Sequence, residues 1–297
     1  MGKIRKCLLA TAAFVALGTS VYAADLARPA YAPPPAPPPV PVCTWCGFYI
    51  GGDVGGYWAS QSATTVPSPS PGFGAPAIGG AGIAGFGNLP TSHGLDRSGF
   101  IGGAYTGYNW QWGQFVAGLE ADISGLGRHS ASSTQTVLAT FPATPSAAYN
   151  MTVNADNTWL ATARARAGFA TGPALWYVTG GAAWTKTSSS TSASGLIDSA
   201  AGIDTLGQFA TVSWNDTKTG FVVGGGVEWM FAPNWIVRAE YLYHQFSGSS
   251  STMPLQGVAA GGGNTCVGGG GAAQCNWAVN TSDLRLNVAR VGVAYKF

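Results

Sequence analysis

Hydrophobic and polar residues alternate with a period of two along eight segments that follow residue 46. Strict alternation predicts β-strands that have one apolar face and one polar face. Each segment has about the length that a tilted strand needs to cross a bilayer. The segments are residues 47–58, 98–111, 114–124, 157–169, 174–186, 218–230, 235–247 and 284–297.

The connections between these segments alternate in length. Three are tight turns, at residues 112–113, 170–173 and 231–234. Four are long and rich in Ser, Thr, Gly and Ala, at residues 59–97, 125–156, 187–217 and 248–283. Short turns at one end and long loops at the other are typical of outer-membrane barrels. The sequence therefore predicts an all-β fold, an eight-stranded antiparallel up-and-down transmembrane β-barrel with short periplasmic turns and long extracellular loops. Because the strand number is even, both termini are expected in the periplasm.

In several of these strands, charged residues occupy the face that is opposite to the apolar one. A charged Arg or Lys at the bilayer midplane costs about 2–4 kcal/mol, so this face is expected to point into the barrel. The predicted lumen charge network is Glu120, Asp122, Arg164, Arg166, Glu228, Arg238, Glu240 and Arg290. These four acids and four bases can neutralise one another, and eight strands enclose a space just wide enough for side chains. We therefore predict a salt-bridged plug and not an open pore. Arg285 has the parity of the lipid-facing Val291, so it is expected above the membrane or after a bulge.

The start of the chain has the features of an export signal. Three basic residues precede an apolar run at 8–17, and the residues before Ala24 fit a cleavage site. We assign 1–23 to a signal peptide, 24–44 to a Pro-rich periplasmic linker and 45–297 to the barrel. A retained anchor helix and a cut before Asp25 are the alternatives. Residues 29–41 predict a polyproline II spacer, either a passive linker or a contact with the cell wall or a partner.

Composition agrees with a membrane protein and argues against nucleic-acid binding. Charged residues make up 9% of the chain, whereas soluble domains have about a quarter. Loss of the signal peptide removes 3 of the 14 basic residues and none of the 12 acidic ones, which leaves a net charge of −1. Many tryptophans lie near strand ends, which suits interfacial aromatic girdles: Trp58, Trp110, Trp112, Trp159, Trp176, Trp184, Trp229 and Trp235.

Four cysteines remain after processing, in two pairs that the barrel would separate. Cys43 and Cys46 precede the first strand, and Cys266 and Cys275 lie in the last long loop. Only pairings within each pair fit this topology, and we predict a Cys266–Cys275 disulfide in the oxidising envelope. The C-x-x-C spacing of Cys43 and Cys46 could indicate redox or metal chemistry, but a strand follows it and no further zinc ligands are near in sequence. The state of Cys43 and Cys46 stays open.

No catalytic, cofactor-binding or metal-binding residues are predicted. His93 and His129 lie in predicted outer loops, where solvated side chains are favoured over haem or metal capture. His244 shares the inward face with Glu240, as a member of the charge network or, as the alternative, half of a catalytic dyad. The chain has neither a G-x-S-x-G motif nor a Gly-Lys-Ser/Thr phosphate loop.

The last strand ends on alternating aromatic residues, Tyr295 and Phe297. This ending resembles the signal recognised by the outer-membrane barrel assembly machinery. Several strand segments resemble the RopB-like branch of the outer-membrane immunogenic protein family, small porin-like surface-antigen barrels of alphaproteobacteria. They are 45–51, 99–103, 107–111, 118–123, 175–184, 224–229 and 238–243. The resemblance covers the strands from 45 to 297 but not the loops, and Cys46 departs from the family's usual small hydroxyl residue. It implies an eight-stranded barrel in the outer membrane.

The favoured function is a structural and surface-exposed barrel that supports envelope integrity and presents its loops. The alternative is a small porin-like channel for solutes or ions, and an outer-membrane enzyme is less favoured. Expected partners are outer-membrane lipid and lipopolysaccharide, the barrel assembly machinery, and a cell-wall or host surface ligand.

Overall fold

The computed structural model describes residues 43–68, 91–127, 130–141, 144–199, 202–254 and 276–297. The predicted signal peptide at 1–23 and all but the last two residues of the Pro-rich segment at 24–44 lie outside this part. The same holds for His129, Cys266 and Cys275. Among the described residues, no helix has the length and apolar character needed to cross a membrane.

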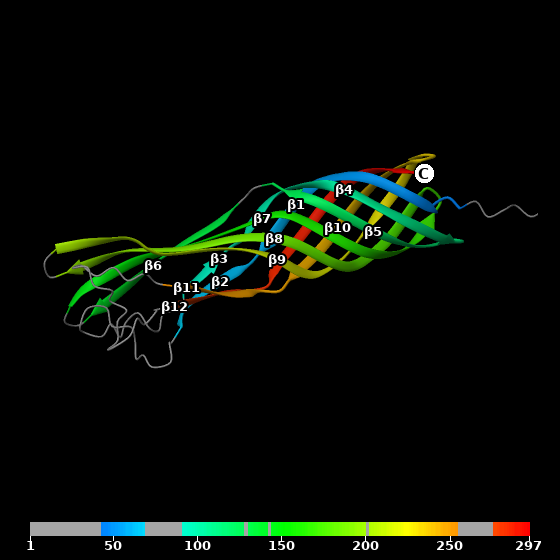
Figure 1. The fold of residues 1–297 in the computed structure, drawn as a ribbon. Helices are drawn as coiled ribbons and strands as arrows, with labels where there is room; N and C mark the ends of the chain where they lie inside the picture. Colours follow the sequence, from blue (N-terminus) through cyan, green and yellow to red (C-terminus); the bar gives the residue numbers. More distant parts are fainter. Residues whose placement is uncertain (1–42, 69–90, 128–129, 142–143, 200–201, 255–275) are drawn as a thin grey trace, which may run out of the picture. The chain divides into compact units, whose positions relative to one another are not determined.

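Long antiparallel strands dominate the described structure (Figure 1). They are β1 (Gly47–Ser60), β4 (Arg97–Trp112), β5 (Phe115–Leu126), β7 (Thr144–Thr171), β8 (Ala174–Ser199), β9 (Gly202–Ala232), β10 (Trp235–Phe246) and β13 (Leu284–Lys296). Each corresponds to one of the alternating segments of the sequence. With β6 they form a sheet in the order β5-β4-β1-β13-β10-β9-β8-β7-β6, and an additional pairing joins β5 to β7. The first and last of the long strands are neighbours, with Gly51 opposite Ala294.

Further strands occupy three of the four segments that the sequence analysis assigned to loops, and β8 and β9 extend through the fourth, at 187–217. β6 (Ala131–Phe141) forms a hairpin with β7. A second sheet contains β2 (Ser62–Ser68), β3 (Thr91–Gly94), β11 (Ser249–Pro254) and β12 (Asn276–Thr281), in the order β11-β12-β2-β3. In the described parts of 59–97, 125–156, 187–217 and 248–283, the interpretation as loops was therefore wrong, because these parts form paired strands. Hydrophobic alternation detects only strands with an apolar face, whereas these Ser- and Thr-rich strands need only a hydrogen-bonded neighbour, and β-branched Thr favours the extended backbone.

The three short connections are two-residue turns, and two of them contain a glycine in the left-handed conformation. Gly113 joins β4 to β5 with φ +62°, and Gly172 joins β7 to β8 with φ +61°. Glycine enters this region without the steric penalty that a Cβ imposes. Both turns lie where the sequence predicted tight connections.

The long strands bury their polar face and expose their apolar face, the reverse of a water-soluble sheet. In β5, Leu119 and Ile123 are 57% and 60% exposed, while Glu120 and Asp122, which lie between them in the sequence, are buried. Most of the tryptophans named above are exposed on the same outward face. Arg285 also lies outward, and β13 pairs continuously there with Ser60 and Gln245, so the alternative of a preceding bulge was wrong.

Candidate functional site: a buried ion-pair layer

Nine charged side chains meet inside the curved sheet, and we call this set the ion-pair layer. Strand alternation positions them, because residues two apart point to the same face. All are 6% exposed or less. The layer consists of Asp53, Glu120, Asp122, Arg164, Arg166, Glu228, Arg238, Glu240 and Arg290. The structure thus brings together all eight residues of the predicted network and adds Asp53.

Glu120 is one centre of the layer. It pairs with Arg164, with Arg166 at 3.3 Å and with Arg238 at 2.8 Å. Tyr49 donates its hydroxyl hydrogen to Glu120 at 2.8 Å. One carboxylate on β5 therefore connects β1, β7 and β10.

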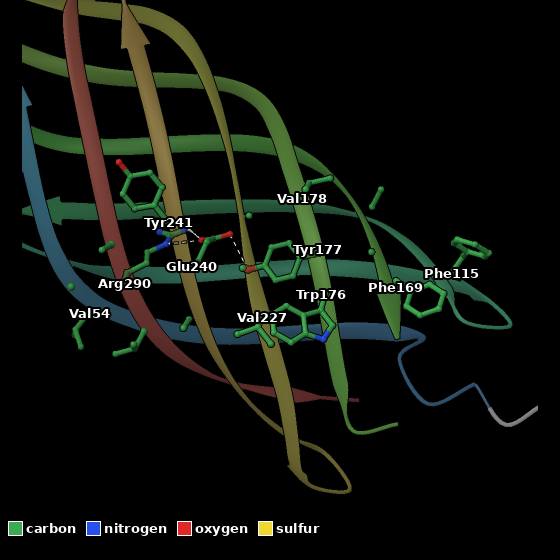
Figure 2. A pocket seen from close by; sticks show the side chains of 18 residues that line it. Val54, Phe115, Phe169, Trp176, Tyr177, Val178, Val227, Glu240, Tyr241 and Arg290 are labelled. Carbon is green, nitrogen blue, oxygen red and sulfur yellow. Dashed lines mark hydrogen bonds and ion pairs between the residues drawn. The ribbon is translucent and has the colours of Figure 1, made fainter. Parts of the chain in front are cut away.

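Glu240 is the second centre. It pairs with Arg164 at 2.7 Å and Arg290 at 2.8 Å, and lies 3.6 Å from Arg238. Tyr177 of β8 donates a hydrogen bond to it at 3.0 Å. Figure 2 shows Glu240 between Arg290 and Tyr177, with the dashed interactions running to both. Charge-assisted bonds of this kind are roughly twice as strong as neutral ones.

The remaining acids complete the network. Asp122 lies 3.1 Å from Arg164 and 3.2 Å from Arg290 and accepts the hydroxyl hydrogen of Thr162. Glu228 pairs with Arg166 at 2.8 Å.

Asp53 lies 3.3 Å from Arg238 and 3.2 Å from Arg290, and the sequence analysis missed it. Its parity opposite Ile50 and Val54 could have revealed it, but the glycines around it hide the alternation. The layer therefore has five acids and four bases, so the predicted balance of four against four was wrong by one negative charge.

Aromatic rings cover the guanidinium groups. The Arg238 carbon Cζ lies 3.3 Å from the ring centroid of Tyr105, and that of Arg166 lies 4.1 Å from Tyr177. Such cation–π contacts stabilise by about 2 kcal/mol when they are desolvated. Tyr105 and Tyr177 come from β4 and β8, which supply no charged residue to the layer. Every long strand therefore supplies either a charged residue of the layer or an aromatic ring that contacts it.

Inward glycines make room for these large side chains. A Cβ at Gly51 would lie 2.5 Å from the Tyr105 ring, and one at Gly226 would lie 2.8 Å from the Tyr177 hydroxyl oxygen. Since interiors of narrow sheets are filled by side chains, large and small residues must alternate around them. This explains part of the 44 glycines in the chain.

Two apolar layers enclose the ion-pair layer along the strands. The turn-end layer lies on the side of the short turns and contains Trp45, Tyr49, Tyr105, Val116, Ala170, Leu175, Ile236 and Ala294, with Met230 packed against it. The loop-end layer lies on the other side and contains Tyr57, Ala59, Ile101, Leu126, Leu160, Ala183, Val222, Leu242, Phe246, Leu284, Leu286 and Val288. Along β10, for example, Ile236 is followed by Arg238, Glu240 and Leu242 in successive inward positions.

A hollow of about 1000 Å³ lies over β8, β9 and β10 (Figure 2). Its lining joins exposed side chains such as Trp176 and Tyr241 to their buried neighbours Tyr177 and Glu240. Neighbours in a strand point to opposite faces, so the lining includes side chains from both faces of the sheet. Its surface is apolar and carries no cluster of free polar groups within the described lining.

The two described histidines are both buried. His93 lies in β3 and is fully buried, so the expectation of a solvated loop side chain was wrong. Burial lowers its pKa below the usual 6.5. Pairing of β2 with β3 places His93 opposite Ala63, one of the residues of a small apolar cluster. His244 is also fully buried. Its ring lies parallel to that of Phe246, a member of the loop-end layer, with the two ring centroids 6.3 Å apart.

Cys43 and Cys46 form a disulfide, which resolves the state that the sequence left open. At the other end of the chain, Phe297 contacts Phe48 and Tyr295, with ring centroids 5.7 and 5.1 Å apart. Tyr295 and Phe297 thus lie beside the start of β1.

A sequence profile of the outer membrane protein beta-barrel domain matches residues 10–297. The chain belongs to this family. The 31 kDa outer-membrane immunogenic protein of Brucella melitensis is 35% identical over 163 residues, which are 52% of this chain and 58% of that protein. The 22 kDa outer membrane protein of Rhizobium leguminosarum bv. viciae is 30% identical over 171 residues, which are 57% and 62% of the two chains.

These relatives confirm the resemblance to alphaproteobacterial outer-membrane barrel proteins. The chain covers less than two thirds of the length of either relative. Among solved structures, Neisserial surface protein A (NspA) is 17% identical, with 84% of this chain and 97% of that chain covered and a TM-score of 0.31. A score this low carries no weight for function.

Proposed function

We propose that this outer-membrane protein is a closed eight-stranded barrel with a sealed interior, which supports the envelope and presents its outer strands and loops at the cell surface. Closure is supported by the pairings, since each of the long strands bonds to a neighbour on both sides and β5 bonds to β7. Closed barrels leave no unpaired edge in lipid.

The three interior layers carry the proposal of a sealed interior. A channel needs a continuous path of water, and here two apolar layers enclose charged side chains that are paired with one another. The side chains of Arg164 and Glu240 are both 0% exposed. The guanidinium and carboxylate groups are paired with one another, so we propose no catalytic role for them.

The orientation follows from the unequal ends. We propose that the short turns and both termini face the periplasm and that β2, β3, β6, β11 and β12 face the outside. The Brucella relatives are named immunogenic, which supports surface exposure of this end. The proposed partners are outer-membrane lipid and lipopolysaccharide, the assembly machinery acting on the last strand, and a cell-wall or surface ligand.

Conductance in planar lipid bilayers tests the seal. We expect no stable channel openings from the purified barrel, while a large porin in the same bilayer provides the positive control. Stable openings on the nanosiemens scale would refute the sealed interior and favour the porin-like alternative. Migration on gels tests closure separately, because a closed barrel resists unfolding until it is boiled, and mobility that boiling leaves unchanged would refute it.

A further inference from the structure

The four residues before β1 form a small disulfide-closed ring, Cys43-Thr44-Trp45-Cys46. Cys43 and Thr44 are exposed, and Cys46 is half-buried. Trp45 between them is 0% exposed. The ring thus presents Cys43 to solvent and directs its one large side chain inward.

Trp45 is a fully buried member of the turn-end layer. The other members of that layer come from β1, β4, β5, β7, β8, β10 and β13, and Met230 of β9 packs against them. Trp45 alone among the described members is not part of a strand. It therefore closes a space that the strands themselves surround but do not fill.

Two hydrogen bonds fasten the ring to opposite neighbours of β1. The Trp45 backbone N–H donates to Oε1 of Gln111 at 2.8 Å, and Gln111 donates through Nε2 to the Gly113 carbonyl at 2.8 Å. On the other side, Lys296 donates through Nζ to the Thr44 carbonyl at 2.6 Å. The β4–β5 turn and the end of β13 hold the ring over the opening.

We propose that this ring is a redox-responsive stopper, in which the disulfide keeps Trp45 in the short-turn opening of the barrel and a dithiol releases it. The proposal rests on the proposed sealed barrel. The disulfide closes the bend at Thr44 and Trp45, whereas an open segment can extend and carry Trp45 out of the turn-end layer.

The chemistry is a thiol–disulfide exchange at an exposed sulfur. A thiolate of the dithiol attacks the exposed Sγ of Cys43, the bond to Cys46 breaks, and Cys46 leaves as a thiolate that takes a proton. The second thiol of the reagent then attacks the mixed disulfide and frees Cys43. The net result is two protein thiols and one oxidised dithiol.

Fluorine NMR of the complete chain, labelled with 5-fluorotryptophan and folded in detergent micelles, tests the stopper. The Trp45 resonance is assigned by its loss in Trp45→Phe, and the same resonance in the oxidised protein, where the Trp45 side chain is buried, serves as the reference. A water-soluble gadolinium chelate reports access of solvent to each ring. We expect a Trp45 signal that the chelate does not broaden in the oxidised protein and broadens strongly after dithiothreitol is added.

The double variant C43S/C46S separates this disulfide from the other cysteines. It should show the broadened Trp45 signal without reductant and no further change when dithiothreitol is added. A Trp45 signal that stays protected in both the reduced protein and the double variant, while gel migration remains heat-modifiable, would refute the stopper alone. If the oxidised wild-type protein were not heat-modifiable, the closed barrel would fail, and the stopper with it.

Discussion

Replacement of Glu120 with glutamine removes the most connected carboxylate of the ion-pair layer. Glu120 pairs with Arg164, Arg166 and Arg238, so three guanidinium groups lose a charged partner at once. Glutamine has the same shape and creates no cavity, so the change measures the ion pairs and not packing. Glu228 offers a graded comparison, because it pairs with Arg166 only.

The structure sets the magnitude expected for Glu120→Gln. Breaking a buried ion pair costs about 3–5 kcal/mol, because a charge is left without its partner. After the change, Arg164 still has Glu240 at 2.7 Å and Arg166 still has Glu228 at 2.8 Å. No guanidinium is left wholly unpaired, so we expect the lower end, about 3 kcal/mol. Glu228→Gln should cost about 1.5 kcal/mol, the value of one hydrogen bond to a charged group.

Urea unfolding of the barrel in lipid vesicles, followed by tryptophan fluorescence, gives the free energy of unfolding for each variant. Asp96 provides the matched control, because it is exposed and accepts a hydrogen bond only from Ser60 among the contacts described. Asp96→Asn should change stability by less than about 0.5 kcal/mol. If Glu120→Gln cost no more than Asp96→Asn, the ion pairs would not stabilise the fold and the reasoning would be refuted.

Three further outcomes are expected. Gly51→Ala should destabilise the barrel by about 1–3 kcal/mol through overpacking, because its Cβ would lie 2.5 Å from the Tyr105 ring. Gly52→Ala is the control and should be nearly neutral in the same urea assay, because its Cβ would meet nothing nearer than 3.5 Å. Equal losses of stability in the two variants would contradict the crowding argument. Tyr177→Phe loses a hydrogen bond to a buried carboxylate and should cost about 1.5 kcal/mol, while Tyr105→Phe should cost less because that hydroxyl has no hydrogen-bond partner among the described residues. Burial lowers the pKa of His93, so the unfolded strand takes up a proton more readily than the folded strand as the pH falls below about 6.5. Hydrogen exchange in β3, corrected for intrinsic rates, should therefore speed up between pH 7 and pH 5. The same acceleration in a His93→Gln variant would show that another group is responsible.

The long strands and the inward charges could be predicted from sequence because lipid and a narrow interior impose opposite demands on alternate residues. Asp122 and Arg164 are each flanked on both sides by apolar residues, so the alternation assigns them to the face opposite to the apolar one. Asp53 has glycines around it, and glycine carries no information about which face is buried. The inward tyrosines, such as Tyr49, resemble ordinary apolar positions in the pattern, although their hydroxyl groups bond to the charged layer.

The outer strands and the ring before β1 could not be predicted for a different reason. The strands β2, β3, β11 and β12 are specified by pairing with segments far away in sequence, such as Ala63 with Thr281, and a period-two pattern does not reveal such partners. Trp45 precedes the alternating segments, so its burial depends on the opening that the folded strands create.

The ion-pair layer also helps to specify the register of the strands, in addition to its contribution to stability. Its bonds join residues far apart in the chain, such as Arg238 with Asp53, which are separated by 185 positions, and Arg290 with Asp122, separated by 168. A shift of one residue in any strand reverses its faces. Such a shift would move a charge into lipid, at about 2–4 kcal/mol for Arg, and would leave its partner unpaired inside. Correct register in β1, β5, β10 and β13 is therefore required at the same time, so the layer penalises barrels in which one of these strands is misaligned.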